Sequence, residues 1–151
     1  MYLEQSLNLI LEFLQSETCG INRHIERINR LRNDDFNLLP LCDADYIVRA
    51  EEIPNKKVFI DVLYEDSQSI IDSREEIGQI SINLGFTASA DNKDYRIRCP
   101  RYREALKKTI IDNLKFKNLD LKLESLSAPT KYNFAGATNI YVIKAVVSMV
   151  V

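Results

Sequence analysis

The amino-acid sequence predicts an α+β fold: an antiparallel or mixed β-sheet of about five to six strands, with N-terminal helices and one long internal helix packed on it. Three observations support this prediction. Alternating apolar and polar segments follow one another through short or polar connections, only two regions show helical spacing, and 151 residues is an ordinary length for one domain. A parallel sheet would need a helix between most strand pairs. We therefore expect a single domain over residues 1–151.

The predicted helices follow from apolar residues that recur every three or four positions. Residues 2–15 carry one such apolar face, and residues 21–31 repeat it with arginines on the opposite side, so a helical region is expected over 1–33. A further helix is expected over 100–115. Pro100 suits the first position of that helix, because its missing N–H would have no partner there.

The first strands are predicted where side chains alternate with a period of two. Residues 77–86 show the clearest alternation, and residues 57–64 show the next clearest. A short extended segment with Tyr46 and Val48 precedes them, so strands and a hairpin are expected over 45–99. The connection 66–74 is polar, with room for a short helical turn at 69–72.

Further strands are predicted on both sides of the internal helix. Residues 95–99 alternate so that Arg96 and Arg98 face outward from a strand. Closing strands are expected over 118–151, at 119–123 and 139–151, with a long loop at 125–138 between them.

The last strand is apolar on both faces. Ile140, Val142 and Val146 point one way, while Ile143 and Val147 point the other. A strand of this kind is buried on both faces. It is therefore either a central strand under helices, which is the favoured reading, or a strand with one face closed by a neighbouring subunit.

The chemistry of the sequence does not indicate an active site. The only histidine, His24, has no triad-like partner and is expected on an exposed helix surface. Cys19, Cys42 and Cys99 are too widely spaced for a zinc site or a disulfide framework, and indicate free thiols in the cytoplasm. The four glycines form no phosphate loop. We expect no enzyme, cofactor or metal, with a site built from scattered carboxylates and tyrosines as a remote alternative.

Membrane and nucleic-acid roles are not favoured either. No apolar run reaches the roughly 18–20 residues that span a bilayer, and the N-terminus lacks the basic and small residues of a secretory signal. The formal charge of −2 gives no reason to expect sequence-specific binding of nucleic acid.

Charge is segregated along the chain. Residues 34–66 carry nine acidic side chains against three basic ones, and residues 93–108 carry seven basic against two acidic. These charges either pair within the monomer, form a head-to-tail interface between subunits, or make a basic track for nucleic acid, which the lack of interleaved aromatic residues disfavours. The interface reading selects ten candidates, the last two from the long loop: Asp43, Asp45, Glu51, Glu52, Arg96, Arg98, Arg101, Arg103, Tyr132 and Phe134.

The order of elements resembles that of the tail-terminator and tail-completion (neck) proteins of tailed bacteriophages and related contractile particles. The resemblance rests on layout: N-terminal helices, an acidic extended segment, a long hairpin, a basic helix that begins Arg101-Tyr102-Arg103-Glu104-Ala105-Leu106, a polar loop and an apolar closing strand.

The resemblance implies a structural protein of the virion, assembled in the host cytoplasm, that has no cofactor and forms a homo-oligomeric ring, typically hexameric. Such a ring caps the tail tube, and its partners are tube, sheath or neck proteins. The alternative is a small non-enzymatic adaptor that binds a partner protein on a sheet edge.

Overall fold

The computed structural model describes residues 3–46, 50–69, 76–89, 92–117, 119–133 and 139–150, and it confirms an α+β fold with an antiparallel five-stranded sheet. Three short 3₁₀ turns accompany the main elements: η1 (Asp43–Asp45), η2 (Ala50–Asn55) and η3 (Asn113–Lys115). The helices and strands are α1 (Leu3–Gln15), α2 (Ile21–Arg32), β1 (Val58–Ser69), β2 (Glu76–Ala88), α3 (Asn92–Ile111), β3 (Lys122–Leu126), β4 (Thr130–Asn133) and β5 (Asn139–Val150).

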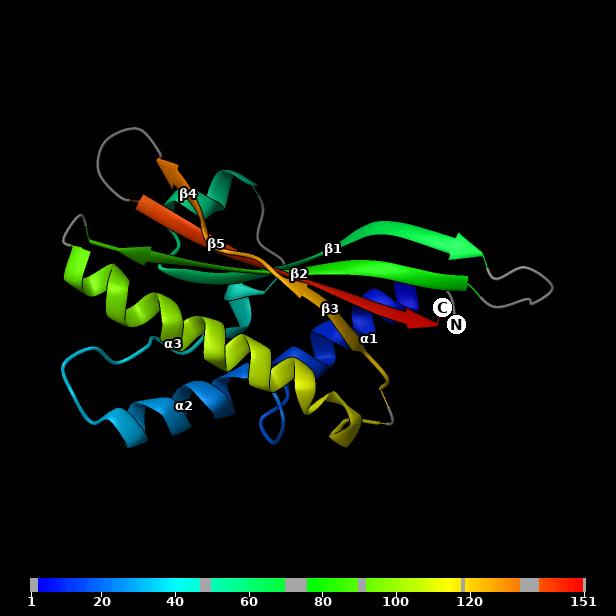
Figure 1. Ribbon diagram of the computed structural model, residues 1–151, viewed down its shortest axis with the longest axis horizontal. Coiled ribbons are helices and arrows are strands. Elements are labelled where there is room, and N and C mark those ends of the chain that lie inside the picture. The colour runs from blue at the N-terminus through cyan, green and yellow to red at the C-terminus, as the bar shows by residue number, and fades with distance from the viewer. Residues whose placement is uncertain are drawn as a thin grey trace.

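The strands are arranged in the order β1-β2-β5-β3, and β4 also pairs with β5 (Figure 1). β3 pairs with residues 145–148 of β5, and β4 pairs with residues 139–142. These two short strands therefore follow each other along the same edge. β5 lies between them and β2, which confirms the favoured central position of the closing strand.

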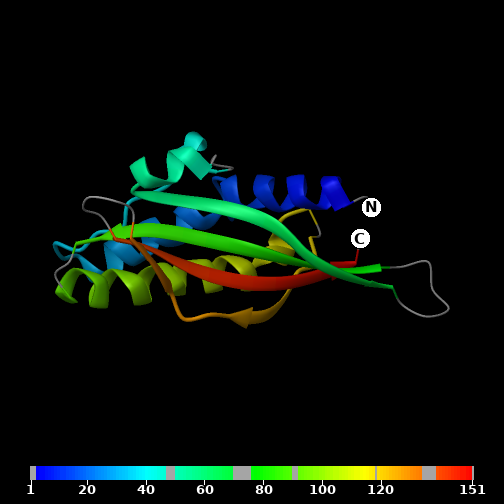
Figure 2. The ribbon, with the colours of Figure 1, turned by 90° about the horizontal axis from the view of Figure 1, so that it is seen from above.

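All three helices cover the same side of the sheet (Figure 1). Ile10, Phe13 and Leu14 of α1 belong to the same buried core as the inward row Ile80, Ile82 and Leu84 of β2. The helical spacing in α1 and the alternation in β2 thus define the two sides of one core. Seen from above in Figure 2, the sheet twists along its length and the β1–β2 hairpin projects past the end of α1.

Helix α3 corrects the strand that was predicted at residues 95–99. The helix already begins at Asn92, so Pro100 lies inside it rather than at its first position. Tyr95, Cys99 and Tyr102 are spaced by four and three residues, as on one face of a helix. This spacing fits a helix as well as the alternation over 95–99 fits a strand. The ring centroids of Tyr95 and Tyr141 lie 4.2 Å apart, and those of Tyr102 and Phe86 lie 4.9 Å apart. Packing of these rings on the sheet therefore favours the helix over the strand.

The long loop predicted at 125–138 also needs correction, because β3 extends to Leu126 and β4 occupies Thr130–Asn133. Between the two strands, Ser127 is still held to β5: its N–H donates to the carbonyl of Lys144 at 2.9 Å, and its hydroxyl accepts the N–H of Lys144 at 3.1 Å. An edge strand exposed along most of its length shows no apolar alternation, and this explains why the pattern suggested a loop.

Two other boundaries differ from prediction. The segment with Tyr46 forms the turns η1 and η2, and Tyr46 makes only an isolated parallel bridge with Ile60, while Val48 lies outside the described residues. β1 continues to Ser69, so residues 66–69 belong to a strand and not to a polar connection. They lie in the projecting hairpin, beyond the helices that would require an apolar face.

Candidate protein-interaction surfaces

The side of the sheet that α1, α2 and α3 leave uncovered is called the helix-free face here (Figure 1). Strand register places alternate residues on it: Phe59, Asp61 and Leu63 from β1 pair with Gly85, Asn83 and Ser81 of β2, and these pair with Val142, Lys144 and Val146 of β5. Phe59 and Ile140 are buried yet lie outside the main core cluster, which shows that they belong to this second face.

A groove of about 340 Å³ crosses the helix-free face and is called the sheet groove. Its floor contains Phe59, Ile140 and Val142, while η2 contributes Ile53 and β4 contributes Tyr132. Leu63 and Tyr132 are each 48% exposed. The outward face of an antiparallel sheet that meets only water is usually polar. An apolar groove here is what a protein-binding surface requires.

Gly85 makes this groove possible. A Cβ atom added to Gly85 would lie 2.2 Å from two ring atoms of Phe59. The ring of Phe59 therefore lies across the bare backbone of β2, where any other residue would displace it. The close packing contact expected for a strand glycine is present, and it fixes one wall of the groove.

Charged groups mark the middle of the groove. The amine of Lys144 lies 2.9 Å from a carboxylate oxygen of Glu65, and Lys144 together with the Ser81 hydroxyl lowers the pKa of Glu65. Partial burial raises the pKa of Asp61, against the opposing effect of a hydrogen bond from the backbone N–H of Val62. A ligand of this face would therefore meet apolar walls, one ion pair and one partly desolvated carboxyl group.

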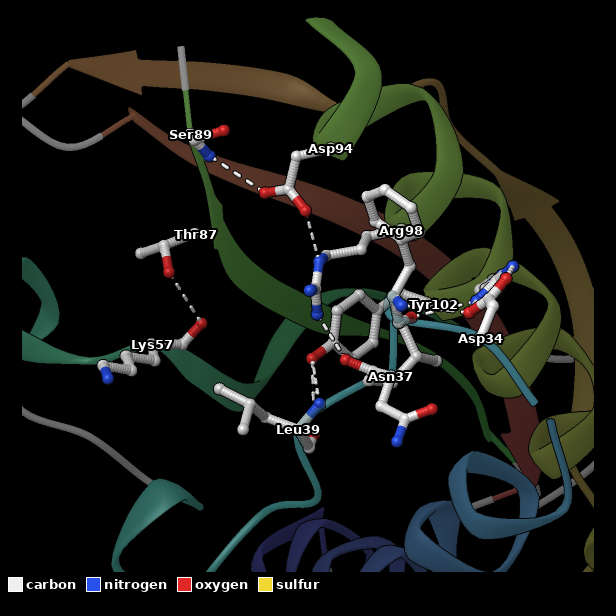
Figure 3. A network of polar contacts seen from close by, with 12 residues as sticks. Asp34, Asn37, Leu39, Lys57, Thr87, Ser89, Asp94, Arg98 and Tyr102 are labelled. Carbon is white, nitrogen blue, oxygen red and sulfur yellow. Dashed lines mark hydrogen bonds and ion pairs between the residues drawn. The ribbon is translucent and has the colours of Figure 1, made fainter. Parts of the chain in front are cut away.

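Several of the predicted interface residues have partners within the chain (Figure 3). The Arg98 guanidinium contacts Asp94 and the backbone carbonyl of Asn37. Arg101 donates to Asp34 at 2.8 Å and to the carbonyl of Phe36 at 2.9 Å, and this pairing lowers the pKa of Asp34 well below its usual range. At Arg101, the acidic and basic segments meet within one molecule.

The same network holds the segment before η1 against α3. The Tyr102 hydroxyl accepts the N–H of Leu39 at 3.0 Å and donates to its carbonyl at 3.3 Å. Asp94 accepts the N–H of Ser89 at 3.0 Å, just before α3 begins (Figure 3). Burial raises the pKa of Tyr102 to about 12, so this hydroxyl stays protonated at neutral pH. These contacts explain a structural role for the basic start of α3.

The other predicted residues have different surroundings. Asp45 accepts from Lys56 at 2.9 Å and from the N–H of Cys42 at 2.8 Å, so its carboxylate caps the turn η1 within the chain. Tyr132 lines the sheet groove, while Phe134 lies outside the described residues. The remaining candidates are exposed: Asp43, Glu51, Glu52, Arg96 and Arg103.

His24 was predicted on an exposed surface, but it is only 7% exposed and lies between α2 and α3. Its Nε2 atom is 3.8 Å from a carboxylate oxygen of Asp112, and its buried Nδ1 atom has no hydrogen-bond partner. Burial lowers the pKa of His24; Asp112 opposes this effect, and Arg23, Lys108 and Arg27 add to it. Its spacing from Ile21 and Ile28 places it on the buried stripe of α2, a signal that the sequence contains.

Two adjoining hollows open beside His24 and together form the α2–α3 crevice. Their volumes are about 50 and 200 Å³, and both are lined by His24 and Arg27. The other lining residues are Cys19, Arg23, Ile28, Leu31, Arg32, Glu104, Lys108, Asp112 and Lys115. Most of the charged side chains in this set are basic, so the crevice suits an anionic group.

The described part of the chain contains no group of three or more His, Cys, Asp or Glu side chains arranged to hold a metal ion. Cys19 and Cys99 are buried free thiols, and Cys42 is an exposed one. Within the same described ranges, no helix has both the length and the apolar composition to cross a membrane. Comparison with known proteins found no matching family model and no matching curated protein.

Proposed function

We propose that this protein is a non-enzymatic building block that associates with further copies of itself through its helix-free face. The observation that carries the proposal is the apolar sheet groove on the face that α1, α2 and α3 leave uncovered (Figure 1). In a protein that functioned as a monomer, the polar half of each strand would be expected on this face. A second protein surface over the groove would remove Leu63 and Tyr132 from water.

A second copy of the chain is the occupant that the surfaces favour. The outer side of the helix layer exposes Leu31, Ile111 and Leu114, which are 72%, 58% and 63% exposed, among basic side chains. The helix-free face has apolar walls, the ion pair of Glu65 with Lys144 and the further carboxyl group of Asp61, which leaves it one negative charge in excess. The two surfaces match in apolar character and oppose in charge.

These surfaces lie on opposite sides of the molecule (Figure 1). A contact between the helix-free face of one copy and the helix layer of the next is therefore heterologous, and repeating it gives a ring when the rotation between copies closes. Together with the layout of the fold, this supports a ring-forming tail terminator or neck subunit, typically six-fold, that caps a phage-type tail tube. Its partners would be tube, sheath or neck proteins in a virion.

The adaptor remains a second candidate because of one edge of the sheet. β1 is an edge strand. Among the described residues, its outer edge is paired only through the isolated bridge between Tyr46 and Ile60. Beyond that bridge, Leu63 and Tyr64 are exposed. An extended peptide could add to this edge through main-chain hydrogen bonds.

The test is the mass distribution of the purified protein by mass photometry and sedimentation velocity. We expect a ring, and we expect Leu63→Lys to abolish it while leaving the unfolding transition intact, because this side chain is half exposed. Leu39→Lys is the matched control, since Leu39 is 45% exposed and lies outside both surfaces. A wild-type protein that stays monomeric, alone and with tail-tube protein, would refute the proposal.

A further inference from the structure

The α2–α3 crevice carries excess positive charge that the chain itself does not neutralise. Five basic side chains line it, namely Arg23, Arg27, Arg32, Lys108 and Lys115, against the acidic Glu104 and Asp112. Lys108 lies 3.0 Å from Glu104, and Lys115 lies 3.9 Å from Asp112. Within the described ranges, neither Arg27 nor Arg32 makes an ion pair with a carboxylate.

One of the residues that line the crevice, His24, has a buried polar atom without a partner. His24 is more than nine-tenths buried, and its Nδ1 atom has no hydrogen-bond partner. A buried polar group without a partner is uncommon and usually has an explanation outside the atoms that surround it. The His24 side chain lines both hollows, beside the Asp112 carboxylate and among the basic side chains of the crevice.

Turn η2 carries two carboxylates, whose negative charge is opposite to the excess positive charge of the crevice. Glu51 and Glu52 are adjacent and exposed, and no described residue forms an ion pair with either of them. The next residue, Ile53, lines the sheet groove, so the turn is fastened to the helix-free face. Figure 1 places η2 on the side of the sheet opposite α2 and α3. Glu51 and Glu52 therefore cannot reach the crevice of their own molecule.

We propose that the α2–α3 crevice of one copy receives Glu51 and Glu52 of the next copy, so that η2 binds in the crevice in the head-to-tail contact. Two carboxylates would nearly balance the unpaired basic charge, and the exposed Leu31 beside the crevice would gain apolar cover. The inference rests on the self-association proposed above and specifies its electrostatic part.

The test is charge exchange between two variants. Arg27→Glu with Arg32→Glu alters the crevice and leaves four acidic against three basic side chains there. Glu51→Arg with Glu52→Arg alters η2. Each variant alone should associate at least about tenfold more weakly than wild type, because like charges then face each other across the contact. All four substitutions in one chain should restore association, since the inverted charges attract again. Arg30→Glu is the matched control: it is exposed on the same helix but does not line the crevice.

The outcomes separate this inference from the proposed function. Weak association of both variants, with recovery in the combined chain, supports the inference. If the wild type forms rings and both variants associate as strongly as it does, the inference is overturned but the proposed self-association stands. The same holds if both variants associate more weakly and the combined chain does not recover. A wild type that never self-associates overturns both. Urea unfolding of each variant shows whether any lost association reflects a lost fold.

Discussion

Gly85 and Phe59 offer a quantitative test of how the helix-free face is built. An added Cβ on Gly85 would lie 2.2 Å from Cε1 and Cζ of Phe59, while ordinary contacts begin at 3.4 Å. The ring would have to retreat by more than about 1 Å in a buried position. Overpacking of this kind costs about 1–3 kcal/mol. We therefore expect Gly85→Ala to lower the free energy of unfolding by that amount.

The same substitution should behave differently after Phe59→Val. The three atoms that the new methyl group would meet all lie beyond Cγ of Phe59, and valine has none of them. Phe59→Val alone should cost about 1–3 kcal/mol through lost packing. In that background, Gly85→Ala should be neutral or should stabilise by up to about 1 kcal/mol, because alanine loses less backbone entropy in a strand than glycine.

The assay is urea unfolding followed by circular dichroism, with the four proteins treated as a double-mutant cycle. A coupling of about 1–3 kcal/mol is expected between the two sites. Gly20→Ala is the control, because its new Cβ would lie 2.3 Å from the backbone oxygen of Ser16, whatever residue 59 is. Equal costs of Gly85→Ala in both backgrounds would refute the account of the groove wall.

Two further predictions concern the interior. The side chain of Asn113 donates to the carbonyls of Ile110 and Leu121 at 2.7 and 2.9 Å and accepts the N–H of Leu121 at 2.9 Å. Asn113→Ala should therefore lower the free energy of unfolding by about 2–4 kcal/mol, because these buried backbone groups lose their partners. Urea unfolding measures this change. The lowered pKa of His24 means that the unfolded chain binds the proton more readily. Stability should therefore fall as the pH drops from 6.5 towards the folded-state pKa, a change measured by unfolding at several pH values and absent in His24→Gln.

Much of the fold follows directly from the sequence, because strong periodicity reflects burial on one side. The stripe of α1 and the alternation of β2 each face the same core, and both elements were predicted within a few residues. The N-terminal part of α3 was not, because the five residues 95–99 fit the period of a strand as well as that of a helix. The ring contacts with Tyr141 and Phe86 favour the helix there, and these partners lie far away in the sequence.

Most of the edge formed by β3 and β4 was missed for a related reason, since the strand predicted at 119–123 overlaps β3 only at residues 122–123. Its side chains are mostly exposed, so alternation carries no apolar signal, and the strands exist because β5 offers hydrogen bonds along its edge. His24 is the opposite case. The sequence places it on the buried stripe of α2, but its position on a helix rich in arginines suggested an exposed surface.

The charged surfaces show what a one-dimensional count of charge leaves open. Segregation along the chain is compatible with pairing inside the molecule and with pairing between molecules, and the structure uses part of the charge for the first. Arg98 and Arg101 are engaged by Asp94, Asp34 and backbone carbonyls, so reversing either would disturb the fold. Unpaired positive charge remains where two helices from different parts of the sequence meet. The α2–α3 crevice is therefore a basic surface available to a neighbour in addition to the exposed Arg96 and Arg103 of α3, and its location depends on helix packing and not on composition.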